Sequence, residues 1–313
     1  MFSFSYLIDA PLIDVKNYPE LNGNINGPSL IETPAWLDRS PGRYLLYFAH
    51  HEGKAIKLAF SDDLAGPWAI HQCDPLSLAD SLFATDSPKL SDLHTDAQAY
   101  IEAGADGNYA HIASPDIYID HARREIRLYY HGRMDNGLQR SRVAISKNGV
   151  NFIAQPEVLG EPYLRVFEQD GWFYGIAMPG QLYRSRNGLS QFEPGPRLTE
   201  EPIRHHALLN LGADCYFFWT RIGDAPERIL VSRLDINDHW LDWRLGECSE
   251  VHRPEKAWEG NAQKVEPSQY GGIMQAVNQL RDPAIFRQGD KLYLLYSIAG
   301  EQGLGIGELQ LEI

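Results

Sequence analysis

The stretch YLLYFAHH at residues 44–51 is an aromatic-rich apolar segment that returns four more times along the chain. The later copies are IRLYYHG at 126–132, WFYGIAM at 172–178, CYFFWTR at 215–221 and LYLLYSI at 292–298. Aromatic runs of this length between polar turns are typical of β-strands, and their recurrence is typical of repeat architectures. The sequence therefore predicts five copies of one strand-based unit.

Each aromatic segment is flanked by further predicted strands. The strands before it begin near Pro28, Pro115, Leu164, His205 and Pro283. The strands after it span residues 56–61, 142–146, 182–185, 229–234 and 304–309. In the first four units a Ser, a polar turn and an aromatic residue follow, as in SKNGVNF at 146–152. This pattern indicates a hairpin into a fourth, outer strand.

Five units of about four short antiparallel strands predict an all-β fold, a five-bladed β-propeller that forms a single domain over residues 1–313. The fifth unit ends at Ile313 with no room for an outer strand. We therefore expect the N-terminal residues 2–8 to supply that strand and to close the ring.

Two long connections, residues 71–111 and 248–279, are expected to carry function or to cover a site. Residues 75–84 within the first connection are expected to form a short helix. The glycines in GLGIG at 303–307 alternate within a strand and lack the spacing of a dinucleotide loop, so no cofactor is expected.

The chain carries 28 Lys and Arg against 42 Asp and Glu, a formal net charge of −14. Such a chain repels nucleic acid and anionic membranes, so neither is an expected partner. Cys73, Cys215 and Cys248 lack the spacing of a zinc site and are expected to be buried thiols. Because no signal-peptide pattern and no apolar run near ~18 residues is present, a cytoplasmic location is expected.

Chain direction alternates between the strands of a blade, so the starts of the innermost strands and the ends of the aromatic strands share one axial face. The starts carry Asn26, Asp116, Arg165, Arg204, His205, His206, Arg281 and Asp282. The ends carry His50, His51, His131 and Arg221. Neighbouring side chains on a strand alternate, so one member of each adjacent His pair should face the channel. Polar residues at this end of all five blades indicate a binding site, although turn capping and structural ion pairs remain alternative interpretations.

The motifs NGPS at 26–29, SPDI at 114–117 and RDPAIF at 281–286, with the SDDLAGPW turn at 61–68, resemble those of five-bladed propeller glycosidases. These include the arabinanase/xylosidase family (glycoside hydrolase family 43), the neoagaro-oligosaccharide hydrolases (family 117) and the invertase/levansucrase group. The family 43 resemblance implies an Asp base in blade one, a second Asp that tunes the acid, and a Glu acid from blade four.

This sequence departs from that pattern in three blades. Asn26 stands where the blade-one Asp is implied, Arg165 replaces an Asp-Pro in blade three, and Arg204-His-His replaces the blade-four Glu. Asp116 matches the second-blade motif, and Asp282 matches the Arg-Asp-Pro motif of the family 117 and invertase types. The implied catalytic residues therefore cannot all be carried over.

Glycoside hydrolysis needs one carboxylic acid and one carboxylate. We predict Asp116 as the base, Asp282 as the residue that orients sugar hydroxyls or tunes its partner, and Glu259, beside Trp258, as the acid. Alternative acids are Glu266, Glu301, His205 and His206. The predicted substrate-binding residues are Asn26, His50, His51, His131, Arg165, Arg204, His205, His206, Arg221 and Arg281.

The predicted activity is hydrolysis of a small oligosaccharide or glycoside, and two other functions remain open. Arg165, Arg204, Arg281 and Arg221 predict a locally positive pocket, which would suit an anionic sugar or a phosphate co-substrate and hence a glycoside phosphorylase. The missing blade-one Asp favours a non-catalytic sugar-binding propeller.

Overall fold

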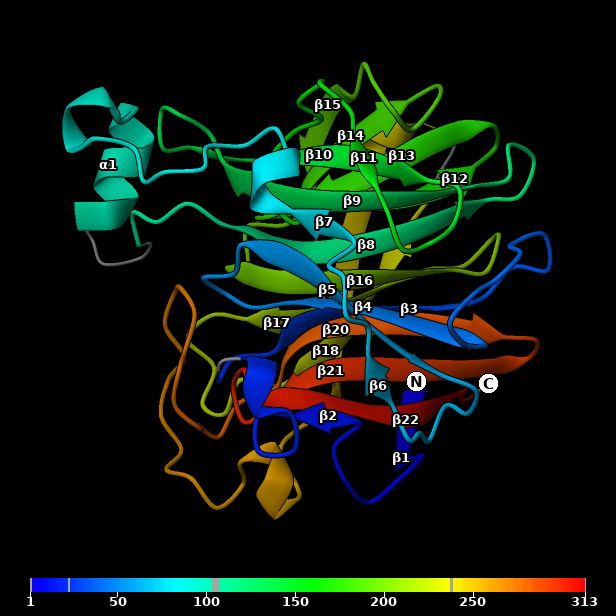
Figure 1. Ribbon diagram of the computed structural model, residues 1–313. Helices are drawn as coiled ribbons and strands as arrows, with labels where there is room; N and C mark the ends of the chain where they lie inside the picture. Colours follow the sequence, from blue (N-terminus) through cyan, green and yellow to red (C-terminus); the bar gives the residue numbers. More distant parts are fainter. Residues whose placement is uncertain (1, 22, 103–106, 237–238, 313) are drawn as a thin grey trace.

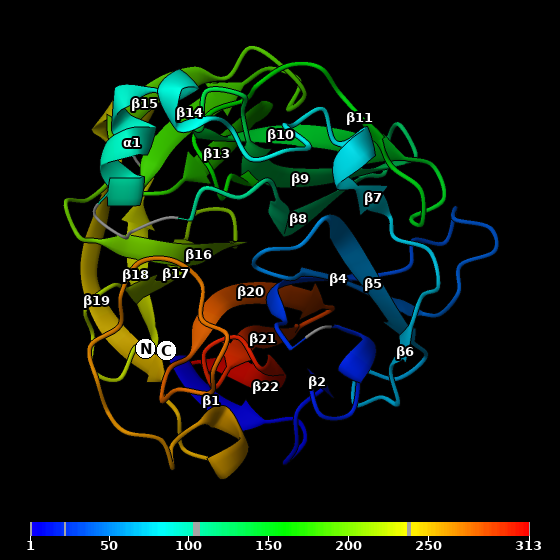
Figure 2. The same ribbon diagram turned by 60° about the vertical axis from the view of Figure 1, so that its left-hand side comes forward.

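Each aromatic segment forms the second strand of an antiparallel sheet in the computed structural model, which describes residues 2–21, 23–102, 107–236 and 239–312. Five such sheets surround a common centre (Figure 1, Figure 2). Their innermost strands contact one another around that centre. The predicted all-β, five-bladed propeller is confirmed.

The strands fall into four positions that are repeated in the blades. The innermost strands are β3 (Asn26–Glu32), β8 (Ile112–Asp120), β12 (Arg165–Gln169), β16 (Ile203–Asn210) and β20 (Arg281–Gln288). The second strands are β4 (Tyr44–Ala49), β9 (Glu125–Arg133), β13 (Trp172–Ala177), β17 (Cys215–Arg221) and β21 (Lys291–Ile298). The third strands are β5 (Ala55–Ser61), β10 (Gln139–Ser146), β14 (Gln181–Ser185), β18 (Ile229–Asp235) and β22 (Gly303–Leu311). The outer strands are β6 (Ala69–Ile70), β11 (Ile153–Ala154), β15 (Glu193–Arg197), β19 (Arg244–His252) and β1 (Phe2–Tyr6). Two short strands, β7 (Leu76–Ser77) and β2 (Ile13–Asp14), pair with β5 and β22.

The N-terminal strand closes the ring, as predicted. β1 pairs antiparallel with β22, with Phe2 opposite Leu311 and Tyr6 opposite Gly307. The two chain ends therefore lie side by side (Figure 1). This pairing covers an edge of β22 that would otherwise be open to another chain.

The repeated tyrosines explain why the aromatic strands recur together with Ser-x-Asn-Gly turns. The buried hydroxyl of Tyr47 in β4 donates to the Gly149 carbonyl in the turn of the next blade, at 2.7 Å. Tyr129 in β9 makes the same bond to Gly188 in the turn of the third blade, also at 2.7 Å. Each tyrosine therefore fixes the spacing between two neighbouring blades.

Five clusters of buried apolar side chains each fill the space between two neighbouring blades. The cluster between blades one and two, for example, contains Leu45 and Tyr47 from β4 and Leu128 and Tyr130 from β9. Burial of large apolar and aromatic side chains is the main stabilising contribution here, at about 25 cal/mol per Å². Because the apolar side chains lie between blades, the ends of the innermost strands remain available for polar groups.

The connections differ from the prediction in three details. Residues 75–84 do not form an α-helix but contain β7 and a 3₁₀ turn, η2 (Leu78–Asp80), because Ser77 pairs with β5 and caps the turn. A true helix, α1 (Thr95–Glu102), lies later in the same connection. β19 extends to His252, so the connection between blades four and five begins five residues later than predicted. The remaining short helices are η1 (Pro19–Leu21), η3 (Leu90–Asp92), η4 (Trp240–Asp242) and η5 (Ala257–Glu259).

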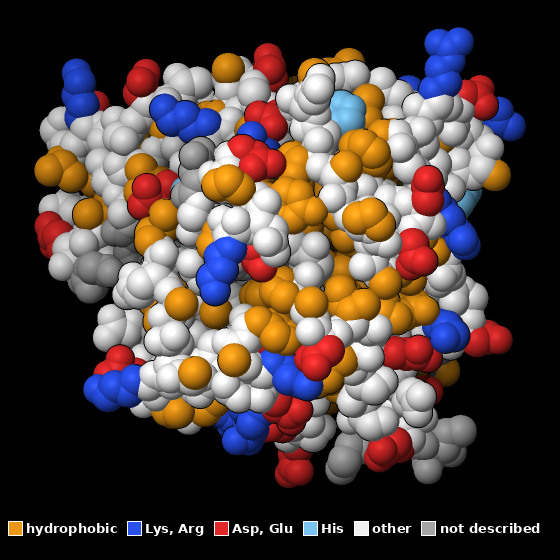
Figure 3. Space-filling view, turned by 60° about the horizontal axis from the view of Figure 1, so that its bottom comes forward, with side chains coloured by type: hydrophobic (Ala, Val, Ile, Leu, Met, Phe, Trp, Pro, Cys, Tyr) orange, Lys and Arg blue, Asp and Glu red, His pale blue; other side chains and the backbone are white. Residues whose placement is uncertain are grey.

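Cys215 is buried as predicted, but the prediction is wrong for Cys73 and Cys248, which are exposed on connections and an outer strand. Across the described part of the chain, no helix combines the length and apolar character needed to cross a membrane. On the face shown in Figure 3, Lys and Arg side chains are interspersed with Asp and Glu rather than gathered in a basic patch.

Candidate functional site

Four of the five innermost strands have a residue in the left-handed backbone conformation close to their start. These residues are Gly27 (φ 60°), Ser114 (φ 52°), Tyr163 (φ 62°), just before β12, and Asp282 (φ 47°). In β3, β8 and β20 this residue falls where the strand pairing shifts register. Three of the four are not glycine, and a non-glycine residue held in this conformation is strained, which is commonest at functional sites.

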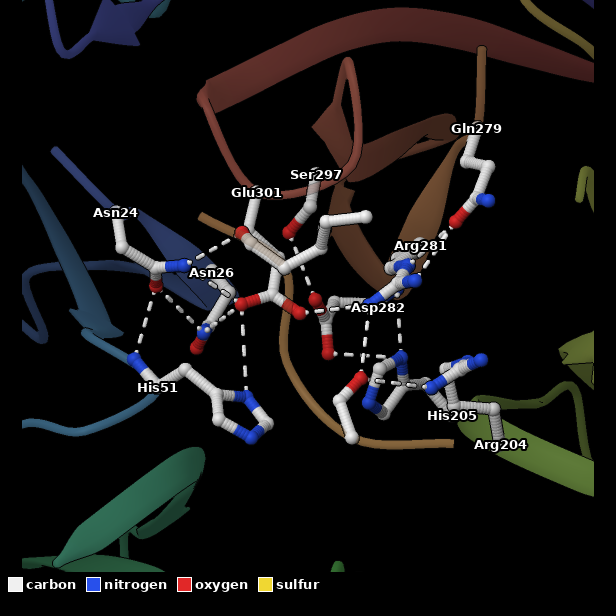
Figure 4. A network of polar contacts seen from close by, with 12 residues as sticks. Asn24, Asn26, His51, Arg204, His205, Gln279, Arg281, Asp282, Ser297 and Glu301 are labelled. Atoms are coloured by element: carbon white, nitrogen blue, oxygen red, sulfur yellow. Dashed lines mark hydrogen bonds and ion pairs between the residues drawn. The ribbon is translucent and has the colours of Figure 1, made fainter. Parts of the chain in front are cut away.

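The Glu301 carboxylate accepts three side-chain hydrogen bonds at this end of the axis (Figure 4). Glu301 lies in the turn between β21 and β22 and is 1% exposed. Asn24 and Asn26 donate their amide hydrogens to its Oε2 at 2.8 and 3.1 Å, and Arg281 donates to Oε1 at 2.8 Å. His51 Nδ1 lies 3.5 Å from Oε2. Burial disfavours the charged carboxylate, but His51, Arg281 and the two amides outweigh it and lower the pKa of Glu301.

Asp282 lies beside Glu301 and has the opposite electrostatics (Figure 4). Its Oδ1 is 3.1 Å from His205 Nδ1, and its Oδ2 accepts a hydrogen bond from Ser297 at 2.8 Å. Burial, together with the negative charge of Glu301, raises the pKa of Asp282 to about 7. The pKa values of these two neighbouring carboxyl groups are therefore separated: Glu301 is ionised, whereas Asp282 can hold a proton near neutral pH.

A buried ion network holds Arg204 and Arg281 against this pair. Arg204 donates to both oxygens of the fully buried Glu227, at 2.9 and 3.2 Å. Arg281 donates twice to Gln279, at 3.1 and 2.7 Å, and its Nε lies 3.8 Å from Glu227. Both guanidinium groups are thus oriented by fixed acceptors, which keeps Arg281 aimed at Glu301.

A loop segment, residues 269–274, crosses this network, and we refer to it as the strap. Its Gly271 carbonyl accepts hydrogen bonds from Arg204 at 3.1 Å and from Arg281 at 3.2 Å. The Gln269 carbonyl accepts from Arg204, and the Ile273 carbonyl accepts from Asn24 at 3.1 Å. In Figure 2 the orange segment that contains the strap lies over the axial end of the ring near β16 and β20. With the strap in this position, Asp282 and Glu301 are both sealed from solvent.

Asp116 and Arg165, two of the predicted site residues, lie deeper along the axis. They line a channel cavity of about 90 Å³ together with side chains from the middles of the innermost strands. Asp116 accepts a hydrogen bond from the Val166 amide at 3.0 Å and lies 3.5 Å from Arg165. Burial raises the pKa of Asp116, opposed by Arg165 and the Val166 amide. By alignment of the Pro115 and Pro283 positions, Asp116 sits two residues further into the channel than Asp282.

Glu259, the predicted acid, lies in a different environment. It is fully buried and accepts hydrogen bonds from Tyr6 at 2.8 Å and Tyr296 at 2.7 Å, with His252 Nε2 at 2.7 Å. Two backbone amides, of residues 255 and 256, also donate to it. Glu259 shares none of these partners with Glu301. Trp258 likewise packs on Tyr6 of the closing strand, and Glu266 pairs with Lys264 on the surface.

In each adjacent histidine pair one member faces the carboxyl pair, although only His205 and His206 lie within a strand. His51 faces Glu301, whereas His50 Nδ1 accepts the Glu52 amide in the following turn. His205 faces Asp282, and burial with the nearby guanidinium groups lowers its pKa well below the usual range.

The remaining three predicted binding residues, His206, His131 and Arg221, make their contacts with groups other than Asp282 and Glu301. His206 stacks on Phe217 in the interior of blade four, and its burial lowers its pKa to about 3. His131 is also buried, 4.4 Å from the Tyr163 ring. Arg221 lies away from the network, where it pairs with Glu201 and stacks over Trp219.

The expected excess of positive charge is not found at the axial end. Arg165, Arg204 and Arg281 are each paired with a carboxylate, of Asp116, Glu227 and Glu301 respectively. Within the described ranges, no group of three or more His, Cys, Asp or Glu side chains is arranged to hold a metal ion. Because each of these guanidinium groups already has a carboxylate partner, the arrangement fits an acid/base site better than a phosphate site.

Sequence reasoning missed Asn24, Glu227, Gln279, Ser297 and Tyr163. The alternation of side chains along a strand could have indicated Asn24, because it lies two residues before Asn26 and donates to the same carboxylate. Glu227 and Gln279 lie in irregular connections and approach each other through a parallel bridge. No periodic signal marks either residue.

Comparison with known proteins identifies one relative by sequence and a shared fold by structure. No protein-family model matches the chain. The chain is 36% identical to the uncharacterized protein R118 of Acanthamoeba polyphaga mimivirus over 308 residues, which span 90% of this chain and 82% of the relative.

Two solved structures illustrate the shared fold. A family 43 β-xylosidase/α-arabinofuranosidase from a compost metagenome, solved with xylotriose, superposes with a TM-score of 0.60, 11% identity and coverage of 100% of this chain and 96% of that one. The Cellvibrio cellulosa α-L-arabinanase, solved with arabinohexaose, gives a TM-score of 0.52 and 15% identity over 92% and 93% of the two chains. At these identities the likeness establishes the fold, that of the family 43 glycoside hydrolases.

Proposed function

This chain belongs to the same family as protein R118 of the mimivirus and has the family 43 propeller fold, and on that premise we propose that it is a glycoside hydrolase of small oligosaccharides or glycosides. The observation that carries the proposal is the pair formed by Asp282 and Glu301. One carboxyl has a pKa raised to about 7 and the other a lowered pKa. Two carboxyl groups with separated pKa values can serve as the acid and the base or nucleophile that glycoside hydrolysis requires.

Asp282 is the proposed acid. In its protonated form it donates a proton to the glycosidic oxygen as the bond to the anomeric carbon breaks. The Ser297 hydroxyl, 2.8 Å away, then donates a hydrogen bond to the carboxylate that remains. The raised pKa leaves the acid protonated at the pH at which Glu301 is ionised.

Glu301 is the proposed carboxylate partner. It removes a proton from the attacking water, or it bonds to the anomeric carbon and is released by water in a second step; both courses add one water across the glycosidic bond. The resemblance to family 43 implies a carboxylate at the start of blade one, where this chain has Asn26. Asn26 donates its amide to Glu301 at 3.1 Å, so the turn between β21 and β22 supplies a carboxylate to that place.

Asp116 receives a supporting role in this proposal. Its bonds to the Val166 amide and Arg165 fix the start of β12 from inside the channel. The substrate enters when the strap lifts, and sugar hydroxyl oxygens then replace the Gly271 and Gln269 carbonyls as acceptors for Arg204 and Arg281.

The test is a screen of aryl glycosides and short oligosaccharides in phosphate-free buffer with the wild type, Asp282→Asn and Glu301→Gln. We expect both variants to remain folded and to lose at least ~10²-fold in turnover, since removal of an acid or base typically has an effect of that size. Glu266→Gln, on an exposed carboxylate, is the control and should keep full activity.

The pH dependence gives a second readout. Activity should fall as pH rises through about 7, where Asp282 loses its proton. Binding of sugars without turnover in any buffer would favour the non-catalytic reading. Turnover that appears only with added phosphate would favour the phosphorylase, for which the paired guanidinium groups offer no free phosphate site.

A further inference from the structure

Tyr163 is held in a strained backbone conformation at the axial start of the third blade. Its φ of 62° lies in the left-handed region, which large side chains rarely adopt. The equivalent positions in blades one, two and five are Gly27, Ser114 and Asp282. Strain of this kind persists where the surrounding contacts over-determine it, and here one of the equivalent residues is the proposed acid.

The Tyr163 ring lies between two histidine rings from different blades. Its centroid is 4.4 Å from that of His131 in β9 and 4.9 Å from that of His205 in β16. Tyr163, His205 and Asp282 thus form one continuous chain of contacts, and the backbones of Tyr163 and Asp282 are both strained.

The contacts of His205 with Asp282 require that its ring keep one orientation. Its Nδ1 lies 3.1 Å from Asp282 Oδ1 and 3.3 Å from the Asp282 amide, so rotation of the ring would break both contacts. The ring is buried in the described structure, and Tyr163 covers one of its faces. Removal of the Tyr163 ring would free the imidazole and admit water beside Asp282.

We infer that Tyr163 is a positioning residue, which holds the His205 ring against Asp282 and excludes water from that pair. The inference rests on the proposed function only in that Asp282 is taken as the acid. The charged and titratable groups around the pair are Arg165 on β12, His131 on β9, Arg204 on β16, Arg281 on β20, His51 after β4, and Glu301 before β22.

The experiment compares Tyr163→Phe, which keeps the ring, with Tyr163→Gly, which removes it and relieves the left-handed strain. Arg124→Gly is the matched control, because Arg124 is an exposed turn residue with φ of 49°. Histidine ring ¹⁵N resonances are followed by nuclear magnetic resonance as a function of pH, without substrate. With Tyr163→Gly, water should reach the pair, the pKa of Asp282 should fall from about 7 and that of His205 should rise.

In the activity assay, Tyr163→Gly should lower kcat by about 10-fold or more with little change in KM, because small displacements of a reacting group have effects of that order. Tyr163→Phe and Arg124→Gly should both match the wild type. Loss of kcat in Tyr163→Phe equal to that in Tyr163→Gly would overturn the inference, since the hydroxyl rather than the ring would then matter. An unchanged His205 titration in folded Tyr163→Gly would also overturn it. Absence of hydrolysis in the wild type would contradict the proposed function but leave the titration test intact.

Discussion

Glu259 and Glu301 are both buried carboxylates of the fifth blade region, and both have lowered pKa values, yet their surroundings differ. Glu259 is held by two tyrosine hydroxyls, His252 and backbone amides, which tie a 3₁₀ turn to the closing strand. Glu301 is held by side-chain amides and Arg281, next to a second carboxyl group and beneath the strap. Burial of a carboxylate therefore does not by itself indicate catalysis, and our proposal for Glu301 depends on the neighbouring Asp282 carboxyl group.

The largest effect expected from this comparison is on the pH dependence of stability, and it comes from Asp282, the carboxyl group beside Glu301. The pKa of Asp282 is about 7 in the folded chain, against 3.8 for an ordinary Asp, so the folded state binds more protons between these values. The stabilising contribution is complete below the unfolded pKa and is lost as pH rises through about 7. A shift of this size corresponds to on the order of 4 kcal/mol.

Asp282→Asn removes this ionisation. Relative to the wild type, its free energy of unfolding should therefore improve steadily from about pH 4 to about pH 8. Urea denaturation at several pH values measures this difference, with the exposed hairpin variant Asp290→Asn as the control. Parallel pH profiles for Asp282→Asn and the wild type would show that Asp282 is not held protonated.

Glu259→Gln should have the next largest effect, and on stability rather than chemistry. Removal of one partner from a buried ionic network typically costs about 3 kcal/mol or more. The loss should appear in urea denaturation, because the Tyr6 and Tyr296 hydroxyls and His252 all lose their charged acceptor. Turnover per folded molecule should stay at the wild-type level. A variant with normal stability and no turnover would return Glu259 to the role of acid.

The contrast between the two carboxylates also shows which features of the fold and of the site could be predicted from the sequence. The five blades were predictable because each one repeats an aromatic second strand, and in the first two blades a tyrosine of that strand meets a turn in the next blade. Asp282, His205, Arg204 and Arg281 were predictable because strand alternation places the starts of the innermost strands at one end of the axis. The prediction for Glu259 depends on its neighbour Trp258 in a long connection, and adjacency in a loop says little about which way a side chain points.

The partners of Glu301 were harder to predict. Its position opposite Asn24 and Asn26 depends on how the turn between β21 and β22 packs against the neighbouring first blade. The position of the strap depends on the path of residues 253–280, and that of Glu227 on the connection between β17 and β18; neither segment carries a periodic pattern. Contacts of this kind are set by tertiary packing alone.

The smallest expected effect concerns the cover over Glu301. A Cβ added to Gly272 would lie 2.3 Å from the His51 ring, so Gly272→Ala must move either the strap or the ring that faces Glu301. A destabilisation of the closed strap by about 1 kcal/mol would raise its open population about 5-fold. Carbethoxylation of His51 by diethylpyrocarbonate should then accelerate by that factor relative to the exposed His239, and chymotryptic cleavage after Tyr270 should accelerate with it. Gly246→Ala is the control, because the added methyl group there meets only the Arg233 carbonyl at 3.4 Å. If His51 reacts at the same rate in both variants, the strap does not govern access to Glu301. Glu259 and Glu301 would then differ only in the groups that surround each carboxylate.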